Sequence, residues 1–598
     1  MLSRCWLSRP IAACLGRRGL SNIQLVEDIT GCAIKRCSPA IVSKLNESIM
    51  GMMFMEPIVK PTLLEIVAAD KSCGIAHILL INDLMKNSSL STSNQELIDK
   101  SFHELNRLLS DNEITEREKY LAAALFAWRQ SNYNKCGMLA ESALLLNPLD
   151  AIAMKLAQDA YLAAGNPKNA LGCVARVFNL FQPSNVFHGH VLGMLSLGYL
   201  ENNKLYEAEE VGTRAVASTK GADPRALNNL LHTYHLSGKS SEISEYIERF
   251  SSKHEDSNGF EKVLYNKGLA LIQRGNYFGA LKVYDQMIQL IQDEDMITQS
   301  LLVNSTFLIL QISIHSTNKH ILKRFRDEKV ASAWLSMLNG GASSPLVDVC
   351  AAISFSHRLY DSIEGEESVD SLSENDDAIY NTKFQNMFSW LKGGGNGSTN
   401  KPTPVVDAME SKDPQQMDQE YINDCTGVLL RHQQYVQGKC NAPSSNRIND
   451  NWSKIEPSFA LNWRHSIVAA SGVPDEQWVT NHVTLPLIKA ISCFTKQEYS
   501  ETATILLSVR DIIHLLGCSA VQMDVFEQMI IESLLRSNQL VEAKILLSER
   551  TVLNPNDAQA WRRLASIYGR LGERELASSA HYTAWQLGIG QGGFLQSN

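Results

Sequence analysis

Residues 561–584 read WRRLASIYGRLGERELASSAHYTA, and this stretch decides the fold class. Its larger apolar residues recur every three or four positions, as they do on one face of an α-helix, and small residues follow in its second half. Small residues let two helices approach closely, while larger apolar residues fill the grooves beside them. The stretch therefore predicts two packed helices that form a helical hairpin. The residues at the decisive offsets are Trp561, Leu564, Ala565, Tyr568, Ala577 and Ala584.

These offsets match the tetratricopeptide pattern W-x2-L-G/A-x2-Y with later alanines, and they return along the chain. Pro555 lies six residues before Trp561 and closes the preceding unit, because proline ends a helix. The spacing between units drifts by a few residues, as solenoids tolerate in their loops. The matching residues are Ile530, Leu534, Ala543 and Leu547; Tyr120, Ala123, Ala124, Ala127, Cys136, Ala140, Ala143 and Pro148; Met154, Tyr161, Ala170 and Val174; Leu192, Tyr199 and Ala208; Leu227, Tyr234 and Ile243; and Leu264, Gly268, Leu271 and Ala280.

We therefore predict an all-α protein, an α-solenoid of tetratricopeptide-like helical hairpins with an acidic and glycine-rich disordered insertion. The predicted regions are a mitochondrial transit peptide over 1–26, an N-terminal helical cap over 27–115, helical repeats over 116–362, the insertion over 363–457 and C-terminal helical repeats over 458–598.

Composition excludes several classes of function. With 44% hydrophobic and 20% charged residues, most of the 598 residues should fold. A net charge of -9 without a basic stripe argues against a nucleic-acid partner. The longest apolar stretch, 307–314, is far shorter than the roughly 20 residues that span a bilayer, so we expect no transmembrane segment.

Motifs for catalysis and for cofactors are missing from the sequence. The 12 cysteines include no CxxC pair, and no Walker loop, Rossmann fingerprint, nucleophile elbow or kinase signature occurs. We therefore predict no catalytic residue, no metal site and no cofactor, and we expect no enzymatic activity. The histidine pairs offer too few ligands for a metal by themselves. As polar or aromatic residues of the repeats, the candidates for a partner-binding groove are Tyr161, His188, His190, Tyr199, His232 and His235.

The first 26 residues contain four arginines together with serines and apolar residues, and no acidic residue precedes Glu27. This composition is typical of a mitochondrial transit peptide. The segment 18–21, RGLS, also fits the pattern of a matrix-protease cleavage site. We expect a mitochondrial protein, and the alternative is a basic tail on a cytoplasmic one, since Pro10 would interrupt an amphipathic helix.

Texture changes between 363 and 457. An acidic run from residue 364 and the glycine-rich segment 393–398 predict disorder. Within it, Phe384, Phe388 and Trp390 belong to a short aromatic cluster, which we interpret as a linear motif for another protein or for this solenoid. Ser371 and Ser373 precede acidic residues, which suggests sites of regulatory phosphorylation.

The stretch from Glu116 to Tyr284, including YLAAALFAWRQSNYNKCGMLAESALLLNPLDA and GNYFGALKVYD, resembles the tetratricopeptide repeat protein 38 family. The segments LPLIKAI, LLGCSAVQMDVFEQMIIESLL and LLSERTVLNPND are similar to its C-terminal half. The resemblance implies an α-helical repeat fold and no established activity, substrate or cofactor. Of the family's H-x-x-x-H-x-x-E motif, matched here by Asn228, His232 and His235, the middle histidine remains, and Asn266 stands where a further family histidine is expected.

Our leading functional hypothesis is a non-catalytic scaffold or adaptor that binds a protein or peptide partner in its concave groove. One alternative is an enzyme, or a carrier of a small molecule or metal, with a site near His188, His190 and His232. Another is an assembly factor regulated by phosphorylation of the insertion.

Overall fold

The computed structural model describes residues 25–35, 38–56, 58–86, 92–251, 259–291, 299–315, 330, 332–334, 344–364, 452, 454–458 and 476–590. Several predictions concern other residues: the transit peptide up to residue 24, the linear motif of Phe384, Phe388 and Trp390, and the serines Ser371 and Ser373 all lie outside this part of the chain. No helix in these ranges has both the length and the apolar character that a membrane span requires.

Before the repeats, a small antiparallel hairpin leads into four helices. Strands β1 (Leu25–Glu27) and β2 (Ala33–Lys35) pair with Val26 opposite Ile34. The helices are α1 (Pro39–Phe54), α2 (Val59–Ala69), α3 (Gly74–Lys86) and α4 (Thr92–Ser110). These elements form the predicted N-terminal cap.

Five helical hairpins follow in the predicted order, which confirms the all-α solenoid. Each begins at a capping residue; Thr115, for example, starts α5 with a capping box in which Glu118 bonds back to it. The hairpins are α5 (Glu116–Arg129) with α6 (Tyr133–Leu146), α7 (Ala151–Ala163) with α8 (Pro167–Ala175), α9 (His188–Glu201) with α10 (Leu205–Ser218), α11 (Pro224–Leu236) with α12 (Ser240–Phe250), and α13 (Phe260–Gln273) with α14 (Tyr277–Leu290). A 3₁₀ turn, η2 (Phe178–Leu180), follows α8.

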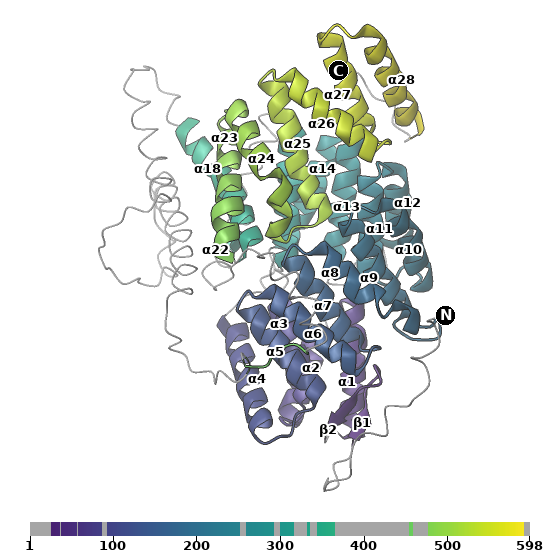
Figure 1. The fold of residues 1–598 in the computed structure, drawn as a ribbon, viewed down its shortest axis with the longest axis vertical. Helices are drawn as coiled ribbons and strands as arrows, with labels where there is room; N and C mark the ends of the chain where they lie inside the picture. The colour runs from purple at the N-terminus through teal and green to yellow at the C-terminus, as the bar shows by residue number, and fades with distance from the viewer. Residues whose placement is uncertain are drawn as a thin grey trace, which may run out of the picture.

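Two long helices lead out of this array, and three more hairpins complete the described chain. The elements are α15 (Gln299–His315), α18 (Pro345–Glu364), α22 (Glu476–Val479), the π-helical turn η7 (Thr480–Thr484), α23 (Leu485–Thr495), α24 (Tyr499–Val509), the 3₁₀ segment η8 (Arg510–Leu516), α25 (Ala520–Arg536), α26 (Leu540–Leu553), α27 (Ala558–Arg570) and α28 (Arg574–Gly590). Figure 1 shows the N-terminal helices at one end of the molecule and α27 and α28 at the other.

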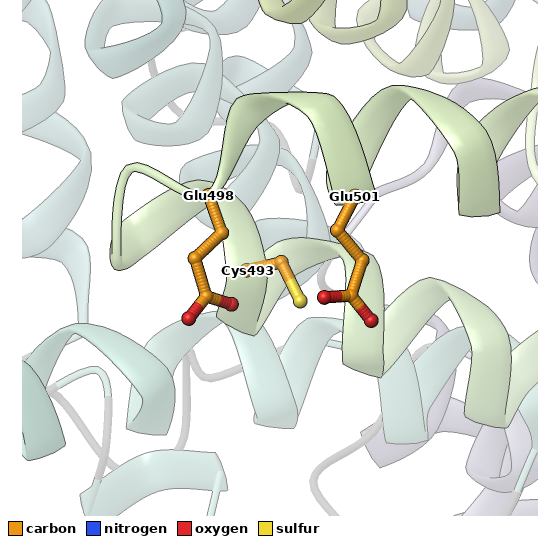
Figure 2. Close-up of side chains that lie close together, drawn as sticks. All are labelled: Cys493, Glu498 and Glu501. Carbon is orange, nitrogen blue, oxygen red and sulfur yellow. The ribbon is translucent and has the colours of Figure 1, made fainter. Parts of the chain in front are cut away.

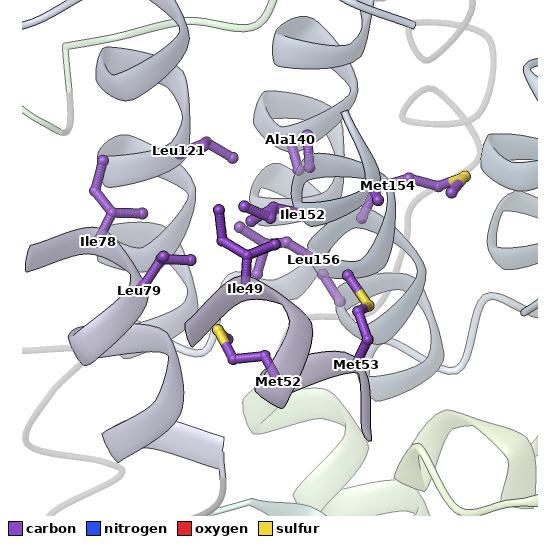
Figure 3. Close-up of a cluster of buried hydrophobic side chains, with 14 of the residues drawn as sticks. Ile49, Met52, Met53, Ile78, Leu79, Leu121, Ala140, Ile152, Met154 and Leu156 are labelled. Atoms are coloured by element: carbon purple, nitrogen blue, oxygen red, sulfur yellow. The ribbon is translucent and has the colours of Figure 1, made fainter. Parts of the chain in front are cut away.

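Two hydrophobic cores hold these elements together. The first reaches from Ile34 to Ala270 and the second from Leu264 to Ile567, so the two meet within α13. In the first core, side chains of α1 and α3 gather with those of α5, α6 and α7 (Figure 3). The cap therefore covers the inner side of the first two hairpins.

The boundaries of the predicted insertion differ from the structure at both ends. Helix α18 continues to Glu364, and Trp452 is buried in the first core although we predicted disorder up to residue 457. Lys135 Nζ of α6 lies 2.9 Å from a carboxylate oxygen of Glu456, and the N–H of Ser458 donates to Ser142 Oγ. The chain thus returns to α6 before it enters the C-terminal repeats.

Candidate functional site

The inner face of the solenoid, which the first helix of each hairpin lines, is filled by the chain itself. No residue of α7, α9 or α11 is exposed, so both sides of these helices are covered. At the N-terminal ends, Phe54 of α1 packs edge-on against His190, and Arg225 Nη1 donates to the carbonyl oxygen of Met52 at 2.8 Å. At the other ends, the C-terminal hairpins make the contacts. The groove that we predicted for a partner is therefore self-occupied.

The contacts with the C-terminal hairpins follow the turns between paired helices. Gln559 of α27 donates to the carbonyl oxygens of Ile272 (2.9 Å) and Gln273 (3.1 Å) at the end of α13. Phe307 of α15 meets Phe526 of α25 edge-to-face at 5.8 Å between ring centroids. These contacts join segments more than 200 residues apart in sequence, and together they make a junction between the first five hairpins and the last three.

Polar side chains of four helices form a hydrogen-bond chain at this junction. Arg563 Nη2 lies 2.7 Å from His315 Nδ1, and since arginine has only donors, Nδ1 must accept. The proton of His315 then sits on Nε2, which donates to Gln528 Oε1. Gln528 in turn donates to Asp524 Oδ2 at 2.6 Å, and Arg550 bonds Asp524 as well. Such a chain rigidifies the junction because every member orients its neighbour.

Arg550 carries the positive charge of this chain. Burial alone would lower its pKa, but the carboxylates of Asp524 and Asp557 outweigh burial and hold it above the usual range. Its Nε donates to Asp557 Oδ2 at 2.8 Å, and Asp557 also caps α27. We assigned no role to Asp524 from the sequence, because its partner Arg550 lies one helix later and its other contacts lie in distant repeats.

His232 and His235 lie on the inner face of α11 and are buried beside this junction. Burial, with the neighbouring His235, lowers the pKa of His232 to about 3, and burial lowers that of His235 to about 4. Both imidazoles are therefore neutral at physiological pH. The ring of Tyr265 on α13 stands edge-on to His232, with centroids 6.0 Å apart.

Several buried polar atoms near this place have no protein partner among the described residues. They gather on α11, α13 and α15, and ordered water normally satisfies such atoms. The set comprises His232 Nε2, His235 Nδ1, Tyr265 Oη, Asn266 Oδ1, Gln273 Oε1, Ser305 Oγ and Gln311 Oε1.

The remaining groove candidates lie apart from this cluster. His190 Nδ1 bonds Asp223 Oδ2 at 2.7 Å, and His188 Nδ1 bonds the carbonyl oxygen of Phe181 at the same distance. His232 lies about 12 Å further along the helix axis than Pro224, which follows Asp223, at 1.5 Å per residue. The structure therefore does not bring His188, His190 and His232 to a common ligand.

The two candidate tyrosines serve the hairpins in different ways. Tyr161 is fully buried, and its ring fills the space that a side chain at Gly137 of α6 would need. Tyr199 is half-buried at the end of α9, where Lys204 Nζ lies 5.9 Å from its ring centroid. Both side chains contact their own repeat.

One group of possible metal ligands occurs among the described residues. Cys493, Glu498 and Glu501 bring a thiol and two carboxylates within 4.8 Å of one another near the α23–α24 turn (Figure 2). Burial and the carboxylates raise the pKa of the Cys493 thiol to about 12, and Lys489 Nζ already binds Glu501 at 2.6 Å. A metal would have to displace both the thiol proton and this lysine.

Large apolar side chains are exposed mainly at the C-terminal end. Of the seventeen that the described residues expose, eight lie between positions 541 and 585. On α26, Val541, Ile545 and Val552 are 55%, 61% and 79% exposed and share one face, since offsets of four and eleven residues return to the same side of a helix. We name these three residues the α26 stripe. We missed it in the sequence, although its position opposite Ala543 and Leu547 was a signal.

Glu201 joins the two parts of the chain at a helix N-terminus. Its Oε2 accepts a hydrogen bond of 2.9 Å from the N–H of Ala520, the first residue of α25. Burial raises the pKa of Glu201 to about 7, although this hydrogen bond acts in the opposite direction.

Replacing Glu201 with glutamine should therefore remove a pH dependence. Between about pH 4.5 and 7 the folded chain retains a proton that the unfolded chain has lost, so this stabilisation is complete below pH 4.5 and is lost as the pH rises through 7. We expect Glu201→Gln to raise the free energy of unfolding by about 2 kcal/mol at pH 8 and to leave it unchanged at pH 4. Urea titrations at both pH values measure this difference, and equal gains at the two would contradict it.

Comparison with known proteins adds little to this description. No protein-family model matches the chain. The similar solved structures include two of a monomeric IFIT1 mutant, one with Gppp-AAAA and one with m7Gppp-AAAA. Each is 12% identical and covers 85% of this chain and 99% of its own, with TM-scores of 0.28 and 0.27. At these TM-scores the likeness carries no argument, and the repeat architecture rests on the helices themselves.

Proposed function

We propose that this protein is a helical-repeat scaffold that binds a protein partner through the α26 stripe on the outer face of its C-terminal hairpins. The observation that carries the proposal is the exposure of Val541, Ile545 and Val552 along one face of a helix whose other face is buried. Contiguous exposed apolar residues of this kind mark interaction surfaces.

The burial of the inner face supports the same choice of surface. Tyr161, His190, His232 and His235 contact other parts of this chain, so a partner could reach them only by displacing folded helices. A partner on α26 needs no such rearrangement.

The surroundings of the stripe indicate the kind of partner. Glu542, Lys544 and Glu549 border it with charges of both signs, while the stripe itself is aliphatic. An amphipathic helix with apolar residues at matching spacing fits such a surface, with polar contacts at the rim.

Affinity purification of tagged full-length protein from its own cells, quantified against a matched variant, tests this proposal. We expect Ile545→Ser to reduce recovery of at least one partner by about tenfold, since loss of a central apolar contact typically weakens binding by this amount or more. Tyr206→Ser, which removes an exposed aromatic from the remote helix α10, is the control and should change nothing. If every partner is recovered equally with the folded Ile545→Ser and Val552→Ser variants, the proposal fails.

A further inference from the structure

One position in the repeats is covered by the next helix in most of the array. It lies eight residues after the small residue that starts the second helix's contact, as Leu144 lies eight after Cys136. Its occupants in α6, α10, α14 and α26 are all buried, because α7, α11, α15 and α27 respectively pack beside them. These occupants are Leu144, Val216, Ile288 and Thr551, with exposed fractions of 5%, 2%, 5% and 4%.

In α28 the same position holds Trp585, which is 56% exposed. Tyr582, one turn earlier, is 57% exposed, and the two rings stack with centroids 6.0 Å apart. No described helix covers this pair, which we name the Trp585 face. Solenoids need a polar outer face at a terminal repeat, and tryptophan and tyrosine are the residues that most often dominate protein interfaces. The array itself shows that what fits here is another α-helix with an apolar face.

The charges of α28 indicate which helix that is. From Leu576 to Gly590 the helix contains no aspartate, glutamate, lysine or arginine. Across a two-fold axis each side chain meets copies of its own neighbours, so a charged face would repel itself, whereas this one does not. In contrast, the outer side of α26 carries Glu542, Lys544 and Glu549.

We propose that the Trp585 face docks against the α28 helix of a second copy of this chain, with the two helices related by a two-fold axis. The 17 residues of α28 span about 25 Å, and one face of such a helix is smaller than the roughly 800 Å² per partner of a standard interface. The dimer should therefore be weak, with a dissociation constant on the order of 10 µM.

Light scattering on the full chain across about 1–200 µM tests the proposal. We expect the mass to rise from 66.5 kDa towards twice that value as the concentration rises. Trp585→Glu and Trp585→Lys, each alone, should remain at 66.5 kDa, while an equimolar mixture should recover dimers because opposite charges then face each other.

Tyr206→Ser is again the control for loss of an exposed aromatic and should dimerise like the original protein. A wild-type chain that stays monomeric at 200 µM would overturn the proposal, as would a dimer that persists in both folded Trp585 variants. Coverage of Trp585 by residues 591–598 of the same chain would give the first of these results. Failure here leaves the proposal for the α26 stripe untouched, because the two surfaces belong to different helices.

Discussion

Replacing Arg117 with leucine should lower the free energy of unfolding by about 3–5 kcal/mol. Arg117 Nη1 lies 2.8 Å from Asp28 Oδ2 and its Nε lies 2.6 Å from Asp150 Oδ2, and all three side chains are buried. Burial alone would lower the pKa of this guanidinium, but the carboxylates of Asp150 and Asp28 hold it above the usual range. Without the arginine, two buried carboxylates would face each other with no counter-charge.

Urea unfolding of the purified chain measures this loss, and two variants calibrate it. Arg107→Leu breaks exposed ion pairs with Glu104 and Asp111 and should cost less than about 1 kcal/mol. Adding Asp28→Asn to Arg117→Leu should recover part of the loss, since one buried charge disappears. A loss as small as that of Arg107→Leu would contradict this interpretation.

Replacing Gly238 with alanine should destabilise the junction between the first five hairpins and the last three by about 3 kcal/mol or more. Gly238 has φ +71°, and a Cβ there would lie 2.6 Å from the carbonyl oxygen of Asn556. Both the left-handed backbone and the contact with another backbone therefore oppose a side chain.

Gly275 provides a matched control in the next hairpin. Its φ is +74° in the equivalent turn, but a Cβ there would meet nothing within 4 Å. Gly275→Ala should therefore show only the backbone strain of about 1 kcal/mol. The difference between the two variants, measured by urea unfolding, isolates the contact with Asn556. Equal losses would mean that the two segments do not touch at Gly238.

The hairpins could be predicted from sequence because the pattern that specifies them is local. Within about 34 residues, Ala543 and Ala577 recur at the places where two helices touch, and Asn or Asp residues such as Asp150 and Asp557 cap the first helices. The tetratricopeptide-like architecture was confirmed for this reason, whereas the specific tetratricopeptide repeat protein 38 resemblance stays a prediction.

The closure of the array could not be predicted in the same way. It depends on pairs such as His315 with Gln528 and Gln559 with Ile272, which are hundreds of residues apart and follow no repeat. A polar residue on an inner face has the same appearance in sequence whether a partner or the chain itself covers it. That ambiguity explains why His232 and His235 were named as groove residues.

The most direct test of the account is whether the C-terminal hairpins cover the ends of the first helices in solution. A diazirine amino acid at position 559 of the full chain, irradiated and analysed by mass spectrometry, measures this contact. The account predicts cross-links from position 559 to residues 272–273 within one chain, distinguished from contacts between copies by mixing ¹⁴N- and ¹⁵N-labelled protein. Cross-links confined to α26–α28 would show an open solenoid with a free groove and would contradict it.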